Sequence, residues 1–257
     1  MNLVVVVLAV VAAVPIGAFL NVVIERVPGR VPLRSEVDPE ADVPVPAITR
    51  WGAVPVHPWI LHRGDRSTLS RRWLWVELTT VAVFAVVAAR YGDESSVVPL
   101  LTLAAGLVAV TYVDLEHLRI PDRITFPLLG LVGLGIVIVS LERDAEANLR
   151  AAALGSVVYF VLLLVPHLIS PRGMGFGDVK LALVMGLVLG WVGYDPRAAA
   201  AGPVRLVLYA LILGCIFGVA FGLVHAGATG RRGEFPFGPA LALGCLVVIL
   251  YAPQLRY

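Results

Sequence analysis

The chain has 257 residues, of which 59% are hydrophobic and 15% are charged, with a mean hydropathy of +0.89. An ordinary soluble domain carries about 45–50% apolar and about 25% charged residues. The apolar excess, gathered in long runs, excludes a soluble globular protein and predicts an all-α, polytopic integral membrane protein. The formal net charge of +2 says little as a total, and the distribution of the basic residues says more.

Eight apolar runs are long enough, or nearly long enough, to cross a bilayer as helices, which requires roughly 17–25 residues. The first run lacks the basic start and the small-residue cleavage site of a secretory signal, so we interpret it as a retained transmembrane helix. The sixth is short, so we expect part of the glycine-rich segment before it to lie at membrane depth. The runs are 3–24, 73–89, 97–113, 124–141, 151–169, 179–192, 204–226 and 239–252.

The basic residues predict the orientation of these helices. When the loops are assigned alternately to two sides, fourteen of the 20 lysine and arginine residues fall on one side and six on the other. Because cytoplasmic loops carry the excess of basic residues, we expect both termini outside and the polar stretch 25–72 in the cytoplasm. Its arginines are mixed with acidic residues, so we interpret it as a loop at the lipid surface. A nucleic-acid partner is not expected.

Two aspartates lie at helix ends on the predicted cytoplasmic side. Asp114 follows the run 97–113, and Asp178 precedes the run 179–192. An ionisable group at this depth is costly and indicates a functional site. Two close carboxylates share one proton, so that one takes a proton from water while the other donates to a scissile carbonyl. We therefore expect this pair to hydrolyse a peptide bond, without a metal or a covalent intermediate.

The residues around Asp178 suggest how a substrate would bind. Glycine tolerates many backbone conformations and has no side chain, so Gly175 and Gly177 would let an extended substrate backbone approach closely. Lys180 stands two residues beyond Asp178. We assign these three residues to substrate binding, and for Lys180 a contact with Asp178 or with a lipid phosphate stays open.

Each aspartate also has a structural interpretation. Asp178 would be the N-cap of the helix that follows it, and Asp114 an interfacial residue that closes its own helix. Asp122, directly after a proline, is expected to be the N-cap of the next helix. The histidines have no metal-ligand spacing and the two cysteines lie in apolar runs, so neither a metal site nor a disulfide framework is predicted.

Four blocks of the sequence resemble the type IV prepilin leader peptidases, which are membrane aspartic proteases with a Gly-x-Gly-Asp motif. By this resemblance Asp114 and Asp178 are the catalytic pair, and 175–178 is the motif. The blocks occur in the family's order and are spread over nearly the whole chain. They are GAFLNVVIERVP at 17–28, DLEHLRIPD at 114–122, GMGFGDVKL at 173–181 and FPFGPA at 235–240.

The resemblance also implies a substrate and a location. The family cuts prepilins and pseudopilins after a glycine that ends a short basic leader, at the cytoplasmic face of the bacterial inner membrane. Many members N-methylate the new terminus with S-adenosylmethionine, which would be the cofactor here only if this chain methylates. Asn21, Glu25 and Arg26 are either binders of the substrate or methyl donor, or residues that pack a helix end.

One departure from the family concerns the first loop. Many members carry two Cys-x-x-Cys pairs there and bind zinc, whereas the loop 25–72 contains no cysteine. A zinc site of four cysteines is therefore excluded in that loop, and none is expected. The resemblance supports proteolysis more firmly than methylation.

Two other functions fit a membrane protein with two aspartates. A transporter that relays protons would favour carboxylates nearer mid-helix and repeated halves, and the sequence has neither. A non-catalytic scaffold for pilus or secretion assembly would predict the loss of an aspartate, and both are present. We therefore expect a single membrane peptidase domain over 1–257 that contains the cytoplasmic loop 25–72.

Overall fold

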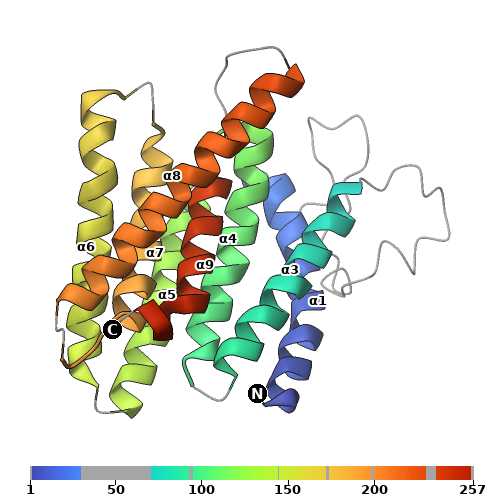
Figure 1. Cartoon of the computed structure of the whole chain (residues 1–257). Helices are drawn as coiled ribbons and strands as arrows, with labels where there is room; N and C mark the ends of the chain where they lie inside the picture. Colours follow the sequence, from blue (N-terminus) through green and yellow to red (C-terminus); the bar gives the residue numbers. More distant parts are fainter. Residues whose placement is uncertain are drawn as a thin grey trace. The chain divides into compact units, whose positions relative to one another are not determined.

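The computed structural model describes residues 2–29, 71–92, 95–143, 145–171, 174–197, 200–229 and 236–255, so most of the predicted loop 25–72 lies outside the described residues. The regular structure in these ranges is helical, and seven helices are long and apolar enough to cross a membrane. The exception is α7, with 17 residues. The prediction of an all-α, multi-pass membrane protein is confirmed. The helices are α1 (Leu3–Arg26), α3 (Arg71–Tyr91), α4 (Val97–His117), α5 (Asp122–Glu142), α6 (Glu146–Ile169), α7 (Phe176–Val192), α8 (Ala201–Thr229) and α9 (Gly238–Leu255) (Figure 1).

The chain divides into two compact units, Met1–Val97 and Val98–Tyr257. In the first unit α1 packs against α3. Gly17 allows this approach, because a β-carbon added there would lie 3.1 Å from Glu77 Cα. The Asn21 side-chain amide donates a hydrogen bond of 3.2 Å to the backbone carbonyl of Trp73, which ties the C-terminal end of α1 to the start of α3.

The second unit is built around α7, which packs against α5, α6, α8 and α9. A helix that is apolar on all sides belongs in a core, and the side chains of α7 from 179 to 189 are largely inaccessible. The seam with α6 is formed by Gly155, Gly186 and Gly190, where an added β-carbon would overlap the backbone of the opposite helix. Small residues of this kind let membrane helices approach closely. The seam therefore fixes α7, and with it the position of its first turn.

Two helices extend beyond the apolar runs that predicted them. α4 continues to His117, so Asp114 lies inside its last turn. α6 begins at Glu146 and not at 151, because an acidic residue in the first turn of a helix is favourable even where the sequence is polar. Hydropathy marks the part of a helix that crosses the apolar layer and misses turns that extend into water.

Both predicted N-caps are wrong, that of α7 by three residues and that of α5 by one. The cap of α7 is Gly175, in an extended conformation, and Asp178 is the third helical residue. The cap of α5 is Pro121, whose carbonyl accepts hydrogen bonds from the amides of Ile124 and Thr125, and Asp122 is the first helical residue. Because another residue takes each cap position, both carboxylates are left available for contacts with other helices.

Candidate active site

Asp114 and Asp178 are both in the second unit and act on each other electrostatically, although 63 intervening residues separate them in the sequence. Asp114 comes from the last turn of α4 and Asp178 from the first turn of α7. Both are buried, with 5% and 7% of their surface exposed, and they are near enough for a charge on one to act on the other. Two buried acids that interact in this way cannot both ionise freely, so the pair is suited to hold a single proton.

Asp114 is held by the first residue of the last helix. The backbone N–H of Gly238 donates a hydrogen bond of 2.8 Å to Asp114 Oδ2. Gly238 is also the N-terminal residue of α9, where unpaired amides favour a negative charge. A β-carbon added at Gly238 would lie 2.8 Å from the same oxygen, so only glycine fits without displacing the carboxyl group. The segment 235–240 was singled out in the sequence by its resemblance to a family block, but no role was predicted for Gly238.

Asp178 has a different environment. Its own amide donates to the carbonyl of Gly175 at 3.2 Å, which closes the first turn of α7. Its Oδ1 atom is buried and has no hydrogen-bond partner among the residues that the structure describes. A β-carbon at Gly175 would lie 3.3 Å from Asp178 Oδ2, so this glycine leaves room beside the carboxyl group. Asp178 Oδ1 is therefore an acceptor within the pair whose hydrogen-bonding capacity is not used by the described residues.

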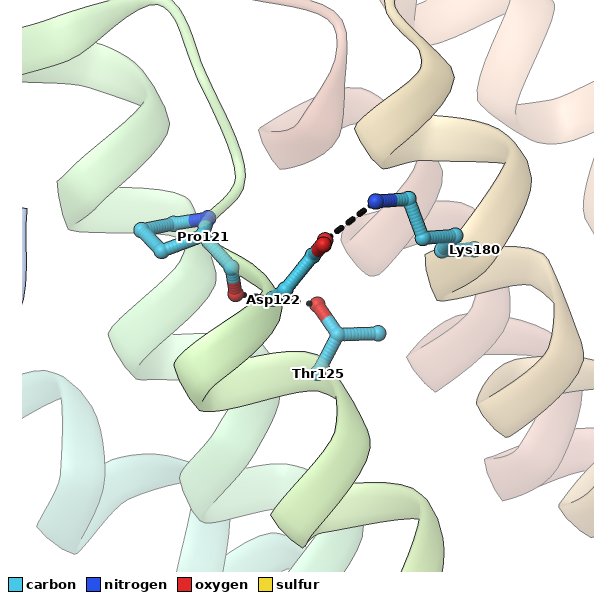
Figure 2. A network of polar contacts seen from close by, with 4 residues as sticks. All are labelled: Pro121, Asp122, Thr125 and Lys180. Atoms are coloured by element: carbon cyan, nitrogen blue, oxygen red, sulfur yellow. Dashed lines mark hydrogen bonds and ion pairs between the residues drawn. The ribbon is translucent and has the colours of Figure 1, made fainter.

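The other two predicted substrate-binding residues have contacts nearby: Gly177 meets the segment between α4 and α5, and Lys180 meets the first residue of α5. A β-carbon at Gly177 would lie 2.8 Å from Ile120 Cβ, so Ile120 occupies the space that the missing side chain leaves. The Lys180 ammonium forms an ion pair and hydrogen bond with Asp122 Oδ1 (Figure 2). Their assignment to substrate binding stays a prediction.

Asn21, Glu25 and Arg26 lie in the first unit, at the end of α1. Asn21 and Arg26 are buried, and Glu25 forms an ion pair of 3.5 Å with Arg72. Within the described ranges, no three or more histidine, cysteine or acidic side chains are grouped so as to hold a metal ion. The glycine at 173 and most of the loop 25–72 lie outside those ranges.

Comparisons with known proteins show which family the chain is similar to. The model of the type IV leader peptidase family matches residues 101–223, which include both aspartates. A prepilin leader peptidase/N-methyltransferase of Dichelobacter nodosus is 31% identical, over 93% of this chain and 89% of that protein. Another of the same name, from Aeromonas salmonicida (strain A449), is 30% identical over 93% of this chain and 88% of its own. No solved structure matches the chain significantly.

Proposed function

Because the chain belongs to the type IV leader peptidase family, we propose that it removes the short basic leader of prepilins or pseudopilins, using Asp114 and Asp178 as its catalytic pair. The observation that carries this proposal is that two buried carboxylates, from α4 and α7, lie near enough for the charge of one to act on the other. They lie at the ends of helices, where a peptide that enters from the aqueous side would reach them. The cut is expected after the glycine that ends the leader.

The hydrogen bonds of the two acids favour a division of tasks. The amide of Gly238 and the N-terminus of α9 stabilise a negative charge on Asp114, so Asp114 is the base that takes a proton from water. Asp178, whose Oδ1 lacks a partner within the described part of the chain, carries the shared proton and donates it to the scissile carbonyl oxygen. The water oxygen bonds to the carbonyl carbon, and the tetrahedral intermediate collapses as Asp114 passes its proton to the leaving nitrogen, the C–N bond breaks and Asp178 takes back its proton.

The backbone near Gly175 supports binding of an extended peptide. Gly175 has an extended conformation (φ −66°, ψ 139°), and its lack of a side chain would let a peptide backbone approach the Asp178 carboxyl group. An extended substrate segment would lie there with its scissile carbonyl facing the acids. The apolar helix that follows the cut in prepilin-type substrates would stay in the bilayer.

We place the active site at the cytoplasmic face of the bacterial inner membrane. The excess of basic residues on one side of the predicted topology supports this orientation, since fourteen of 20 lysine and arginine residues fall on the side of both aspartates. Labelling of single cysteines introduced near 119 and 172 tests it. Protection from an impermeant reagent in intact cells is expected, and labelling from outside would contradict the orientation.

Methylation of the new N-terminus is a second activity supported by the names of the relatives. S-adenosylmethionine, when bound, supplies the methyl group. In the first unit, Asn21 Oδ1 is buried without a hydrogen-bond donor among the described residues, and the Glu25 carboxylate lies one turn further along α1. These acceptors fit the amino group of such a donor. Proteolysis by the aspartates requires no cofactor.

The decisive experiment is co-expression of the chain with a prepilin-type substrate, followed by mass spectrometry of the product. We expect a cut directly after the leader glycine, and a loss of cleavage of roughly a thousandfold in Asp178→Asn and in Asp114→Asn. An additional methyl mass on the product would establish the transferase. Normal cleavage by either variant, with the protein inserted in the membrane, would refute the catalytic pair. Absence of any cut by the unchanged chain would favour a scaffold.

A further inference from the structure

Lys180 is the only lysine in a chain with 19 arginines. Residues two apart on a helix do not share a face, so Lys180 and Asp178 project from α7 in different directions. Figure 2 shows the Lys180 ammonium directed at Asp122, the first residue of α5. The lysine therefore joins α7 to α5, and its charge is matched by Asp122 and not by Asp178.

Aromatic rings surround the ammonium on both helices. Lys180 Nζ lies 5.0 Å from the centroid of the Phe176 ring on α7 and 5.8 Å from that of Phe126 on α5. Both distances are within the range of cation–π attraction. The Lys180 side chain is only 18% exposed, whereas that of Asp122 is 53% exposed. The ammonium is thus held in one place by two rings and one carboxylate.

A second contact lies beside the ion pair. The chain leaves α4 through Leu118, which has a positive φ of 51° and donates its amide to the Asp114 carbonyl at 2.9 Å. Two residues later, Ile120 packs on the α-carbon of Gly177, the residue directly before Asp178. The turn that follows Asp114 is therefore held against the turn that contains Asp178.

We propose that these contacts form a clasp that sets the separation of the two catalytic aspartates, with Asp122 and Lys180 as its positioning residues. The clasp consists of the Asp122–Lys180 ion pair, the rings of Phe126 and Phe176, and the Ile120–Gly177 contact. It deepens the function proposed above and rests on it. The geometry assigns Lys180 this task in place of the substrate contact expected from the sequence.

The clasp acts on geometry more than on stability. A partly exposed ion pair adds little to the stability of a fold, because water competes with it and its side chains lose freedom. Its effect on the reaction is larger, since a displacement of about 1 Å at reacting groups costs about a hundredfold in rate. Loss of the pair should therefore lower kcat while the protein stays folded.

The test uses the full chain in lipid nanodiscs with a prepilin-type substrate. Lys180→Met is expected to lower kcat about 10- to 100-fold, to change KM less than about threefold, and to leave the melting temperature nearly unchanged. The exchange of both residues, Asp122→Lys with Lys180→Asp, should recover at least about tenfold of that loss. Arg123→Met removes an exposed positive charge from the same turn of α5 and serves as the matched control, with unchanged kinetics.

Three kinetic results would overturn the clasp. Unchanged kcat in Lys180→Met would show that the pair has no role in the reaction. A raised KM with unchanged kcat would mean that Lys180 contacts the substrate. Failure of the exchanged pair to exceed the single variants, although it is folded, would show that the ion pair is not what matters.

A spectroscopic measurement tests the pair without relying on activity. Because Lys180 is the only lysine, labelling lysine with 13C at Cε gives one resonance that requires no assignment. We expect this resonance to move in Asp122→Asn and to stay in place in Asp178→Asn. The opposite result would mean that Lys180 pairs with the catalytic acid, and would overturn the proposal. If the unchanged chain cleaves no substrate, the proposed function fails, while this resonance still decides the contact.

Discussion

Substitution of Gly238 by alanine is expected to perturb Asp114, one acid of the proposed catalytic pair, through a single methyl group. The added β-carbon would lie 2.8 Å from Asp114 Oδ2, 3.3 Å from its Cγ and 3.4 Å from its Cβ. Non-bonded carbon atoms prefer separations of about 3.5–4.0 Å, so the carboxyl group has to retreat by roughly half an ångström. The amide of residue 238 is retained in the variant, but its hydrogen bond of 2.8 Å to Oδ2 becomes longer or bent.

Two effects set the size of the expected loss. A displacement of about 1 Å at a reacting group costs about a hundredfold in rate, so half of that distance costs about tenfold. A hydrogen bond to a charged group contributes about 1.5–3 kcal/mol, and partial loss of it lowers the rate further. We therefore expect Gly238→Ala to lower kcat about 10- to 100-fold, with little change in KM because the substitution does not touch the proposed substrate path.

The assay is cleavage of a prepilin-type substrate at several concentrations, with folding followed by thermal unfolding. Gly130→Ala is the matched control, because a β-carbon at Gly130 would meet no atom within 4 Å and α5 gains helix propensity there. Its kinetics should equal those of the unchanged chain. A Gly238→Ala variant with the same kcat as Gly130→Ala would show that the amide and position of residue 238 do not govern Asp114.

Three further predictions concern stability and metal dependence. Gly186→Ala places a methyl group on the backbone carbonyl of Gly155 and should destabilise the protein by about 1–3 kcal/mol in an unfolding titration; an unchanged midpoint would refute the seam. Trp191 Nε1 donates a buried hydrogen bond of 3.0 Å to Ser140 Oγ, so a double-mutant cycle of Trp191→Phe and Ser140→Ala should give a coupling of about 0.5–1.5 kcal/mol, and zero coupling would contradict it. Incubation with a chelator should leave kcat unchanged, because the loop 25–72 lacks cysteine and the proposed pair needs no metal; a loss that zinc restores would contradict this.

Much of the fold could be predicted from hydropathy, because each helix of a membrane protein carries its own signal in a run of apolar residues. The limits of α4 and α6 could not, since their end turns are polar and carry no such signal. The predicted caps failed for a related reason. Capping rules describe a local competition for backbone amides, and they do not tell which neighbouring residue takes the position when Gly175 or Pro121 is also available.

The candidate site, like the fold, could be predicted only in part. The aspartates could be singled out because a carboxylate at the end of an apolar run is conspicuous, but their partners come from distant segments. Gly238 is 124 residues from Asp114, and Lys180 is 58 residues from Asp122. No pattern of spacing along the chain predicts pairs at such separations. A motif can mark the participating segments, yet only the packing of helices shows which atoms meet.

Helix α7 is held by interactions of different physical kinds on its two sides, one facing α6 and the other facing α5. On one side of α7, the glycines at 155, 186 and 190 place backbone against backbone, and such a seam cannot yield without loss of packing. On the side that faces α5, Lys180 meets the half-exposed carboxylate of Asp122, a contact that water can replace. Changes in the seam should therefore lower stability, whereas changes at Lys180 should lower the rate of cleavage with little loss of fold. In the proposed clasp, loss of the Lys180–Asp122 contact should shift the turn after Asp114 while the glycine seam still holds α7 in place.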